Sequence, residues 1–193
     1  MGALPLYQMT EEEYLLFEEQ SEERHEYYQG ETFAMAGGSV THARIMQNTA
    51  RAIGNALDGK GCEAFGSDLR IRIEAFGLYT YPDMSIVCDD LKYYKDRTDT
   101  IVNPVVIIEA LSPGTESYDR GEKFAFYREI PALQEYLLIL SAKMQVEHYR
   151  RQESGQWLLT VYNKPDDLVL IESVAERIPI AELYDRVEWT QAS

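Results

Sequence analysis

Long hydrophobic runs, cysteine clusters and an N-terminal targeting signal are missing from this sequence. No apolar stretch approaches the length of a membrane span, so we expect no membrane contact. The first nine residues contain no lysine or arginine, which argues against a signal peptide. The two cysteines, Cys62 and Cys88, form neither a disulfide framework nor a metal-ligand motif, so we expect free thiols in a reducing compartment. These absences predict a cytoplasmic protein.

Positive charge is also scarce. The chain has 33 acidic and 18 basic residues among 193, which gives a formal charge of −15. Proteins that hold nucleic acid through its phosphates usually present a basic face, so any nucleic-acid surface here must be a local patch. The candidate patches are Arg70 with Arg72, then Arg120 with Lys123 and Arg128, and the pair Arg150 and Arg151. We expect binding at such a patch to be weak and strongly salt-dependent.

The composition is that of a folded globular chain. Hydrophobic residues make up 45%, and no linker, repeat or low-complexity tract divides the sequence, so we expect a single domain over residues 1–193. Apolar periodicity predicts helices over residues 10–20, 39–57 and 118–129, and strands over 30–35, 68–74, 79–87, 104–110, 135–140, 146–150, 156–162 and 168–172, with a loop over 88–103 and an amphipathic segment over 178–184. This order predicts an α/β fold with a central mixed β-sheet flanked by helices.

Two apolar strands each carry one carboxylate. Asp83 lies in Tyr-Pro-Asp-Met-Ser-Ile-Val at 81–87, and Glu109 lies in Pro-Val-Val-Ile-Ile-Glu-Ala-Leu-Ser-Pro at 104–113. A carboxylate between buried valines and isoleucines is costly unless it is paired or binds a cation. Lys123 follows on the next helix. Two carboxylates suit Mg²⁺ or Mn²⁺, and an adjacent ammonium can offset charge on a phosphate, so the pattern favours phosphodiester hydrolysis.

Two further residues are candidates for this site. Glu26 could add a third acid, and His42, near the start of the second helix, could contact a metal, a water or a phosphate. Each candidate also has an ordinary structural explanation. Asp83 could close a turn after Pro82, Glu109 could reach solvent or pair with an arginine, and Lys123 could be a solvated surface charge. Glu26 stands in an acid-rich segment that is typical of a solvated helix face.

These residues resemble the Uma2 family, a domain of unknown function labelled as a restriction endonuclease, within the PD-(D/E)XK nuclease superfamily. The resemblance is carried by Glu26, Gly30, Glu31, residues 35–39 (Met-Ala-Gly-Gly-Ser), His42, Asp68, residues 81–83, residues 109–113, Asp119, Lys123, Tyr127, Glu135 and Tyr136. It implies a nuclease-like core, Mg²⁺ or Mn²⁺ as cofactor with Asp83 and Glu109 as ligands, and Glu26 as an acid drawn from the first helix. A homodimer is expected because nucleases of this superfamily often pair.

One position departs from the superfamily pattern. The lysine normally stands two residues after the second acid, where this chain has Leu111, and the Uma2 pattern instead supplies Lys123 from the next helix. Three hypotheses follow. The chain is a metal-dependent nuclease that acts on DNA, or an inactive nuclease-like protein that binds nucleic acid or a protein, or a metal hydrolase that acts on a small phosphorylated compound.

Overall fold

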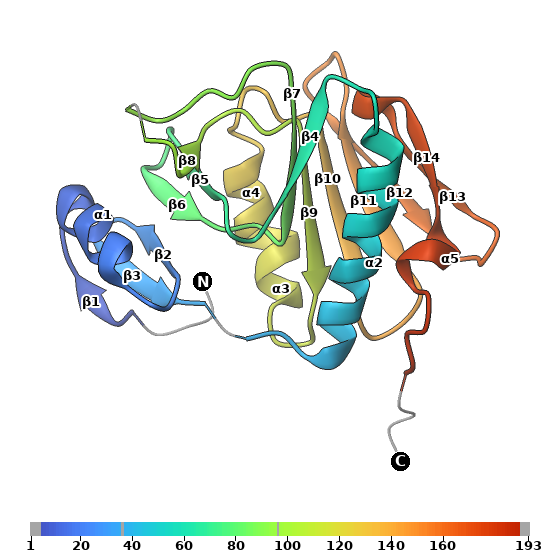
Figure 1. Ribbon diagram of the computed structural model, residues 1–193, viewed down its shortest axis with the longest axis horizontal. Helices are drawn as coiled ribbons and strands as arrows, with labels where there is room; N and C mark the ends of the chain where they lie inside the picture. The colour runs from blue at the N-terminus through green and yellow to red at the C-terminus, as the bar shows by residue number, and fades with distance from the viewer. Residues whose placement is uncertain (1–4, 36, 96, 190–193) are drawn as a thin grey trace.

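The computed structural model describes residues 5–35, 37–95 and 97–189 (Figure 1). Residues 1–4 of the N-terminal segment, which we expect not to be a signal peptide, lie outside this part. Ala36, one of the residues that carry the family resemblance, also lies outside it.

The sheet with the longer strands, called the larger sheet from here on, is a six-stranded mixed sheet. Its strands, in spatial order, are β12 (Trp157–Tyr162), β11 (Val146–Arg151), β10 (Glu135–Leu140), β9 (Val106–Leu111), β7 (Met84–Cys88) and β4 (Cys62–Gly66). Only β9 and β10 among these neighbours run parallel, and every residue of both strands is buried. Such near-continuous apolar strands are typical of a sheet that is covered on both faces.

A second six-stranded sheet lies beside the first. Its spatial order is β1 (Tyr7–Gln8), β3 (Glu31–Ala34), β2 (His25–Tyr28), β6 (Leu78–Thr80), β5 (Arg70–Ile73) and β8 (Thr100–Ile101). A two-stranded sheet of β13 (Leu168–Ile171) and β14 (Glu176–Pro179) completes the strands. The chain passes from β6 in the second sheet to β7 in the first within three residues, and Asp83 is one of those three.

Two helices have clear start signals in the sequence. The helix α1 (Glu11–Gln20) begins with a capping box, in which the Thr10 side chain accepts from the Glu13 backbone and the Glu13 side chain accepts from the Thr10 backbone. The helix α2 (Val40–Leu57) begins at Ser39, whose hydroxyl accepts from the His42 N–H at 3.2 Å. This cap places His42 in the first turn of α2.

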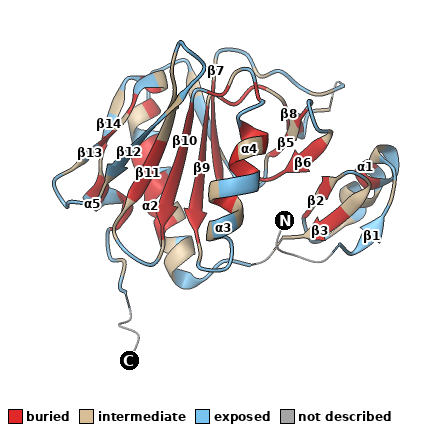
Figure 2. Cartoon of the chain, turned by 180° about the vertical axis from the view of Figure 1, so that it is seen from behind, coloured by how far each residue is buried: buried red, intermediate tan, exposed pale blue. Residues whose placement is uncertain are grey.

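Helices cover both faces of the larger sheet. Alternation along β9 sends Ile108 and Ala110 toward α2, and Ile107, Glu109 and Leu111 toward the opposite face. That second face is covered by a helical segment made of α3 (Glu116–Tyr118), a π-helical turn (Asp119–Lys123) and α4 (Phe124–Tyr127). Figure 2 shows this segment over the buried centre of the sheet. Glu109 is therefore the charged residue of β9 that faces the helix carrying Lys123.

The expected α/β fold with a central mixed sheet flanked by helices is confirmed, with several differences of detail. The strand expected over 79–87 is two strands, β6 and β7, in different sheets, so Asp83 lies in the connection between them and not on a strand. The loop expected over 88–103 contains β8. The sequence predicts one sheet, whereas the structure has a second six-stranded sheet built from short strands. Strand β2 replaces an expected charged connection, because His25 and Tyr27 are buried on one side of an otherwise polar segment. Strand β4 was not expected, because most of its residues are exposed at the sheet edge. The short helix α5 (Ile180–Leu183) follows β14 and accounts for the amphipathic segment.

The expectation of free thiols is wrong. Cys62 on β4 and Cys88 on β7 form a disulfide, and they are direct partners in the antiparallel register with Cα atoms 4.0 Å apart. Two isolated cysteines give no hint of this in the sequence, because the pairing of β4 with β7 is what brings them together. The argument for a reducing compartment therefore loses its support.

The search for membrane-spanning helices gives a simple result. Within the described residues, none of the helices combines the length and the apolar character needed to cross a membrane.

Candidate functional site

Asp83 and Glu109 are neighbours across the pairing of β7 with β9. Met84 on β7 faces Ile108 on β9, so the residue before β7 lies next to the residue after Ile108. The Asp83 backbone N–H donates to Oε2 of Glu109 at 3.2 Å, and the Ala110 N–H donates to Oδ2 of Asp83 at 2.8 Å. The two carboxylates predicted from the sequence are thus held together by backbone hydrogen bonds.

Lys123 reaches this pair from the π-helical turn. Its Nζ lies 2.7 Å from Oε1 of Glu109 and 3.7 Å from Oδ1 of Asp119, one turn earlier on the same segment. Lys123 and Glu109 are both almost fully buried, with 8% and 4% of their surfaces exposed. Lys123 is therefore not a solvated surface charge. A π-helical turn inside an α-helix is a frequent feature of functional sites, and here it contains both Asp119 and Lys123.

Glu26 also lies near Lys123, but it comes from a strand. The expectation that it is drawn from the first helix is wrong, because α1 ends before Ser21 and Glu26 belongs to β2 in the second sheet. Its Oε1 lies 4.0 Å from the Lys123 Nζ and accepts a hydrogen bond from the Thr80 hydroxyl. The site therefore draws residues from both six-stranded sheets.

Two hydroxyl groups assist the site in ways that sequence reasoning did not assign. The Tyr127 hydroxyl donates to Oε1 of Glu109 at 2.8 Å from a fully buried position on α4. Thr80, at the end of β6, orients Glu26 as described above. Tyr127 belongs to the family-like pattern, and its separation from Lys123 by one helical turn could have indicated its direction. No sequence signal points to Thr80.

His42 contacts the exposed side of the site. Its Nε2 lies 3.0 Å from Oδ2 of Asp83, and both side chains are about one-fifth exposed. The imidazole packs against Gly38 so closely that a Cβ built on Gly38 would lie 2.7 Å from Nδ1 of His42. Gly38 therefore has to be glycine for His42 to keep this position. Asp83 and His42 form the face of the site that solvent can reach.

Burial dominates the electrostatics of the inner residues. Loss of water raises the pKa of Glu109 to about 8; the Lys123 ammonium opposes this rise, while Asp83 and Asp119 add to it. Burial likewise raises the pKa of Asp119. Desolvation alone would lower the pKa of Lys123, but the surrounding carboxylates Glu109, Glu26 and Asp119 outweigh it and raise that pKa well above its usual value. Lys123 therefore strongly favours its ammonium form in this site.

The outer pair behaves in the opposite way. Burial acts to raise the pKa of Asp83, but the hydrogen bond and charge of His42 and the N–H of Ala110 lower it below the usual value. The hydrogen bond to Asp83 in turn raises the pKa of His42. Asp83 therefore stays ionised at neutral pH, next to an imidazole that favours its protonated form.

Comparisons with known proteins agree with this architecture. The Uma2 family, described as "Putative restriction endonuclease", matches residues 11–181. The chain belongs to the Uma2 family. This confirms the resemblance that the sequence motifs carry.

Two relatives and one solved structure are similar to this chain over most of its length. The chain is 42% identical to the uncharacterized protein slr1290 of Synechocystis sp. over 86% of each chain. It is 40% identical to a second uncharacterized protein of that organism, sll1609, over 79% of this chain and 86% of the relative. A crystal structure from Anabaena variabilis, described as a putative nuclease belonging to DUF820, matches with a TM-score of 0.75 and 22% identity, over 91% of this chain and 97% of that one. This last likeness shows a shared fold.

Not all residues of the family-like pattern lie in the site. Asp68 is exposed and pairs with Arg24. Glu135 is fully buried but lies on the α2 face of the sheet, where it accepts hydrogen bonds from the backbone N–H groups of Glu172 and Ser173. These two residues have structural partners, whereas Asp83, Glu109, Lys123, Glu26 and His42 form one contiguous group.

The expected basic patches are largely neutralised. Arg70 is 2% exposed and pairs with Asp99 beneath the rings of Tyr14 and Tyr79, so it cannot reach a phosphate. Arg72, the second member of this patch, pairs with Glu11. In the other two patches, Arg120 pairs with Glu116 and Glu147, and Arg150 pairs with Glu172. The prediction of an arginine patch at residues 70–72 is therefore wrong, because these side chains stabilise the second sheet instead.

The side chains of the site supply only part of the ligands that a divalent ion needs. In the part of the chain that the structure describes, no group of three or more histidine, cysteine, aspartate and glutamate side chains is arranged to hold a metal ion. Asp83 and Glu109 nevertheless supply adjacent hard oxygen ligands, and Asp83 is partly exposed. This fits Mg²⁺ or Mn²⁺, which are commonly bound by one or two carboxylates and complete their coordination with water and substrate phosphate.

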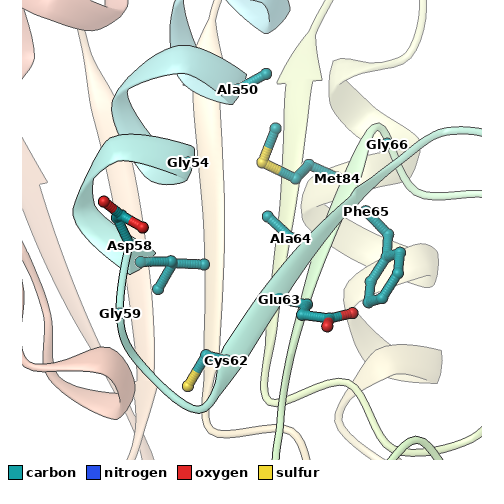
Figure 3. Close-up of a pocket in the computed structure, with 11 residues that line it drawn as sticks. Ala50, Gly54, Asp58, Gly59, Cys62, Glu63, Ala64, Phe65, Gly66 and Met84 are labelled. Atoms are coloured by element: carbon teal, nitrogen blue, oxygen red, sulfur yellow. The ribbon is translucent and has the colours of Figure 1, made fainter.

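A cleft of about 420 Å³ lies elsewhere, between the C-terminal half of α2 and the edge strand β4 (Figure 3). Small residues line it, including Ala50, Gly54, Ala64 and Gly66. Its only acidic lining residues are Asp58 and Glu63, and none of the five site residues borders it. The cleft is therefore separate from the carboxylate site.

Proposed function

We propose that this protein is a metal-dependent phosphodiesterase that cleaves DNA, with Asp83 and Glu109 as metal ligands and Lys123 as the assisting cation. The observation that carries the proposal is that three buried or half-buried ionisable side chains from separate elements are in contact. Asp83 precedes β7, Glu109 lies on β9, and Lys123 lies on the π-helical turn, yet hydrogen bonds of 2.7–3.2 Å link them. Apolar residues in place of a buried ion pair often leave the stability of a fold unchanged or raise it. A purely structural role therefore gives little reason for these side chains to be buried here.

Each side chain has a distinct role in this proposal. Asp83 and Glu109 would hold Mg²⁺ or Mn²⁺, which when bound polarises a phosphate and lowers the pKa of a coordinated water. Lys123, whose raised pKa favours the ammonium form, orients Glu109 and offsets negative charge that develops on the phosphoryl group. His42 keeps Asp83 ionised and can hold a proton at Nε2, at the face open to substrate. Glu26 and Asp119 keep Lys123 in place.

Family membership supports the nuclease class. The Uma2 description names a restriction endonuclease, and the structural neighbour from Anabaena variabilis is titled a putative nuclease. The superfamily resemblance implies in-line attack that leaves a 5′-phosphate. The proposal includes a single domain over residues 1–193, which the contact of Glu26 in one sheet with Lys123 over the other supports. It also includes a homodimer and a cytoplasmic location. The disulfide does not support the cytoplasmic location.

A second candidate is an inactive nuclease-like protein that binds nucleic acid or a protein. The observation in its favour is that Oε1 of Glu109 already has two partners, Lys123 and Tyr127. The charge of −15 and the neutralised arginines fit this candidate as well. A small phosphorylated compound would also tolerate the acidic surface better than DNA does.

Cleavage of labelled single-stranded and double-stranded DNA in Mg²⁺ and Mn²⁺ tests the proposal. The test variants are Asp83→Asn and Lys123→Met, and the matched controls are Asp90→Asn and Lys92→Met at exposed positions. We expect metal-dependent cleavage that both test variants lose and both controls keep. Cleavage that survives in Asp83→Asn would reject the assignment, and absence of any cleavage by the wild type would favour the inactive candidate.

A further inference from the structure

The edge strand β12 exposes an uncharged apolar segment. Its sequence is Trp-Leu-Leu-Thr-Val-Tyr over 157–162, and it forms one border of the larger sheet. Leu158, Leu159 and Val161 are 48%, 45% and 45% exposed. Because Leu158 and Leu159 are adjacent and point to opposite faces, both faces of the strand are open at its edge. Edge strands are usually protected by charge, proline or a bulge, and β12 has no charge and no proline.

The backbone of β12 also offers unpaired groups. The β11–β12 turn closes with the Gln152 N–H donating to the Gln156 carbonyl at 2.7 Å. Ladder hydrogen bonds alternate along an antiparallel pair, and Arg150 faces Leu158, so Leu158, Thr160 and Tyr162 bond to β11. The N–H and carbonyl groups of Trp157, Leu159 and Val161 therefore point outward, away from every strand that the structure describes.

We infer that β12 is a dimerisation strand, which pairs antiparallel with β12 of a second copy about a two-fold axis at Leu159. In this register Leu159 faces its own copy, and Trp157 faces Val161, so every outward backbone group finds a partner. A register shifted toward Thr160 would need the N–H of Asn163, which already donates to Asp167. On the opposite face, Leu158 lies against Thr160. The two six-stranded sheets become one twelve-stranded sheet, and this inference is independent of the proposed enzymatic function.

The distribution of charge around β12 favours a second copy of this chain as its binding partner. Two chains of charge −15 repel each other, and β12 is a segment where they can meet without opposing acids. Arg151 lies beside the start of β12, where its neighbour Arg150 is paired with Glu172, and Asp166 and Asp167 follow the end of the strand. Antiparallel pairing brings the start of one strand to the end of the other. Arg151 of each copy therefore lies near Asp166 and Asp167 of the other at both ends.

The size of the strand sets the expected strength. Six residues span only about 20 Å. Pairing of two such strands alone therefore buries less surface than the roughly 1,600 Å² of a standard interface. We therefore expect a dimer that dissociates on dilution.

Sedimentation velocity over a range of concentrations tests the inference on the full chain. The test variant Leu159→Lys places like charges opposite each other at the two-fold axis. The control Leu16→Lys makes the same change at an exposed leucine of α1, which is 60% exposed. We expect the wild type and the control to dimerise with rising concentration and Leu159→Lys to stay monomeric. A wild type that is monomeric throughout, or a variant that dimerises like the control, would overturn the inference.

A second variant tests the register and does not depend on weakening the strand. In Leu159→Cys the two thiols would lie on facing residues, whose Cα atoms are about 5.5 Å apart in such a pair, within disulfide range. We expect oxidation to give a covalent dimer of Leu159→Cys and none of Leu16→Cys. Equal crosslinking of both variants would show random collision and would count against the interface.

Discussion

Glu109 is the residue on which the inner site depends. It accepts hydrogen bonds from the Asp83 backbone, Lys123 and Tyr127, and it lies on a strand whose other residues are all buried and apolar. Burial raises its pKa to about 8 against the opposing effect of the Lys123 ammonium, so the charged form of this carboxyl is costly in the metal-free protein. A cation bound beside Glu109 would offset this cost.

The raised pKa of Glu109 predicts how stability changes with pH. The folded protein holds the Glu109 proton up to about pH 8, whereas the unfolded chain releases it near 4.5. The contribution of Glu109 to the free energy of unfolding therefore falls as pH rises from 4.5 to about 8, by an amount on the order of a few kcal/mol. The free energy of unfolding by urea can be measured at several pH values across this window. It should fall less steeply with pH in Glu109→Gln than in the wild type, and as steeply as in the wild type in the exposed control Glu63→Gln. Identical slopes in all three proteins would contradict the burial argument.

His42 gives a second prediction of pH dependence. Its pKa is raised above 6.5 by the hydrogen bond to Asp83, so its stabilising contribution is present below pH 6.5 and is lost as pH rises through the folded pKa. An NMR titration of the imidazole should give a midpoint above 6.5 in the wild type and a lower one in Asp83→Asn. A midpoint that does not move in this variant would mean that Asp83 is not the partner of His42.

The sequence indicated which candidate residues lie together better than it indicated the elements that carry them. Asp83 and Glu109 stand out because a carboxylate among valines and isoleucines breaks the apolar pattern of a buried strand. Glu26 was assigned to the wrong element, because nothing local distinguishes a strand at 25–28 from a charged connection. Arg70 was assigned to the surface, because its burial depends on tyrosines and Asp99, which are distant in sequence. Contacts that cross between sheets are outside the reach of local patterns.

At the scale of elements, caps and periodicity were sufficient for the long helices. Thr10 with Glu13 indicated the start of α1, and the apolar run at 135–140 indicated β10. For α2 the sequence offers two starts, Ser39 and Thr41, and the structure has Ser39 as the N-cap. The helix expected over 118–129 is instead a composite of α3, a π-helical turn and α4. A π-helical turn has no sequence signature, yet here it is the element that directs Lys123 toward Glu109.

The disulfide between β4 and β7 predicts a loss of stability on reduction. It joins two residues that are 26 positions apart in the sequence, and the segment between them contains β5, β6 and Asp83. In the chain-entropy description, a loop of this length is worth about 3 kcal/mol. We expect urea unfolding of Cys62→Ser and of the reduced wild type to show a loss of this size.

Intact-mass analysis after alkylation of the native, unreduced protein provides the control. We expect no alkylated cysteine before reduction and two after it. Two modified thiols in the unreduced protein would show that the bond is absent.

At the scale of the whole molecule, net charge governs the encounter with DNA. The formal charge is −15, and several of the basic residues first considered for a phosphate contact are paired with acids. We therefore expect retention on a DNA column only at low salt, with a steep loss as salt rises, and stronger retention when a divalent ion is present. Retention that survives moderate salt without a divalent ion would require a basic surface that these ion pairs do not leave.

The central claim is that the carboxylates of Asp83 and Glu109 bind a divalent ion, and titration calorimetry with Mn²⁺ tests it most directly. We expect one binding event per chain in the wild type and in the exposed control Asp90→Asn, and none in Asp83→Asn or Glu109→Gln. Equal binding by all four proteins would place the ion elsewhere. Absence of binding by the wild type would contradict the account and leave the buried cluster with a structural role alone.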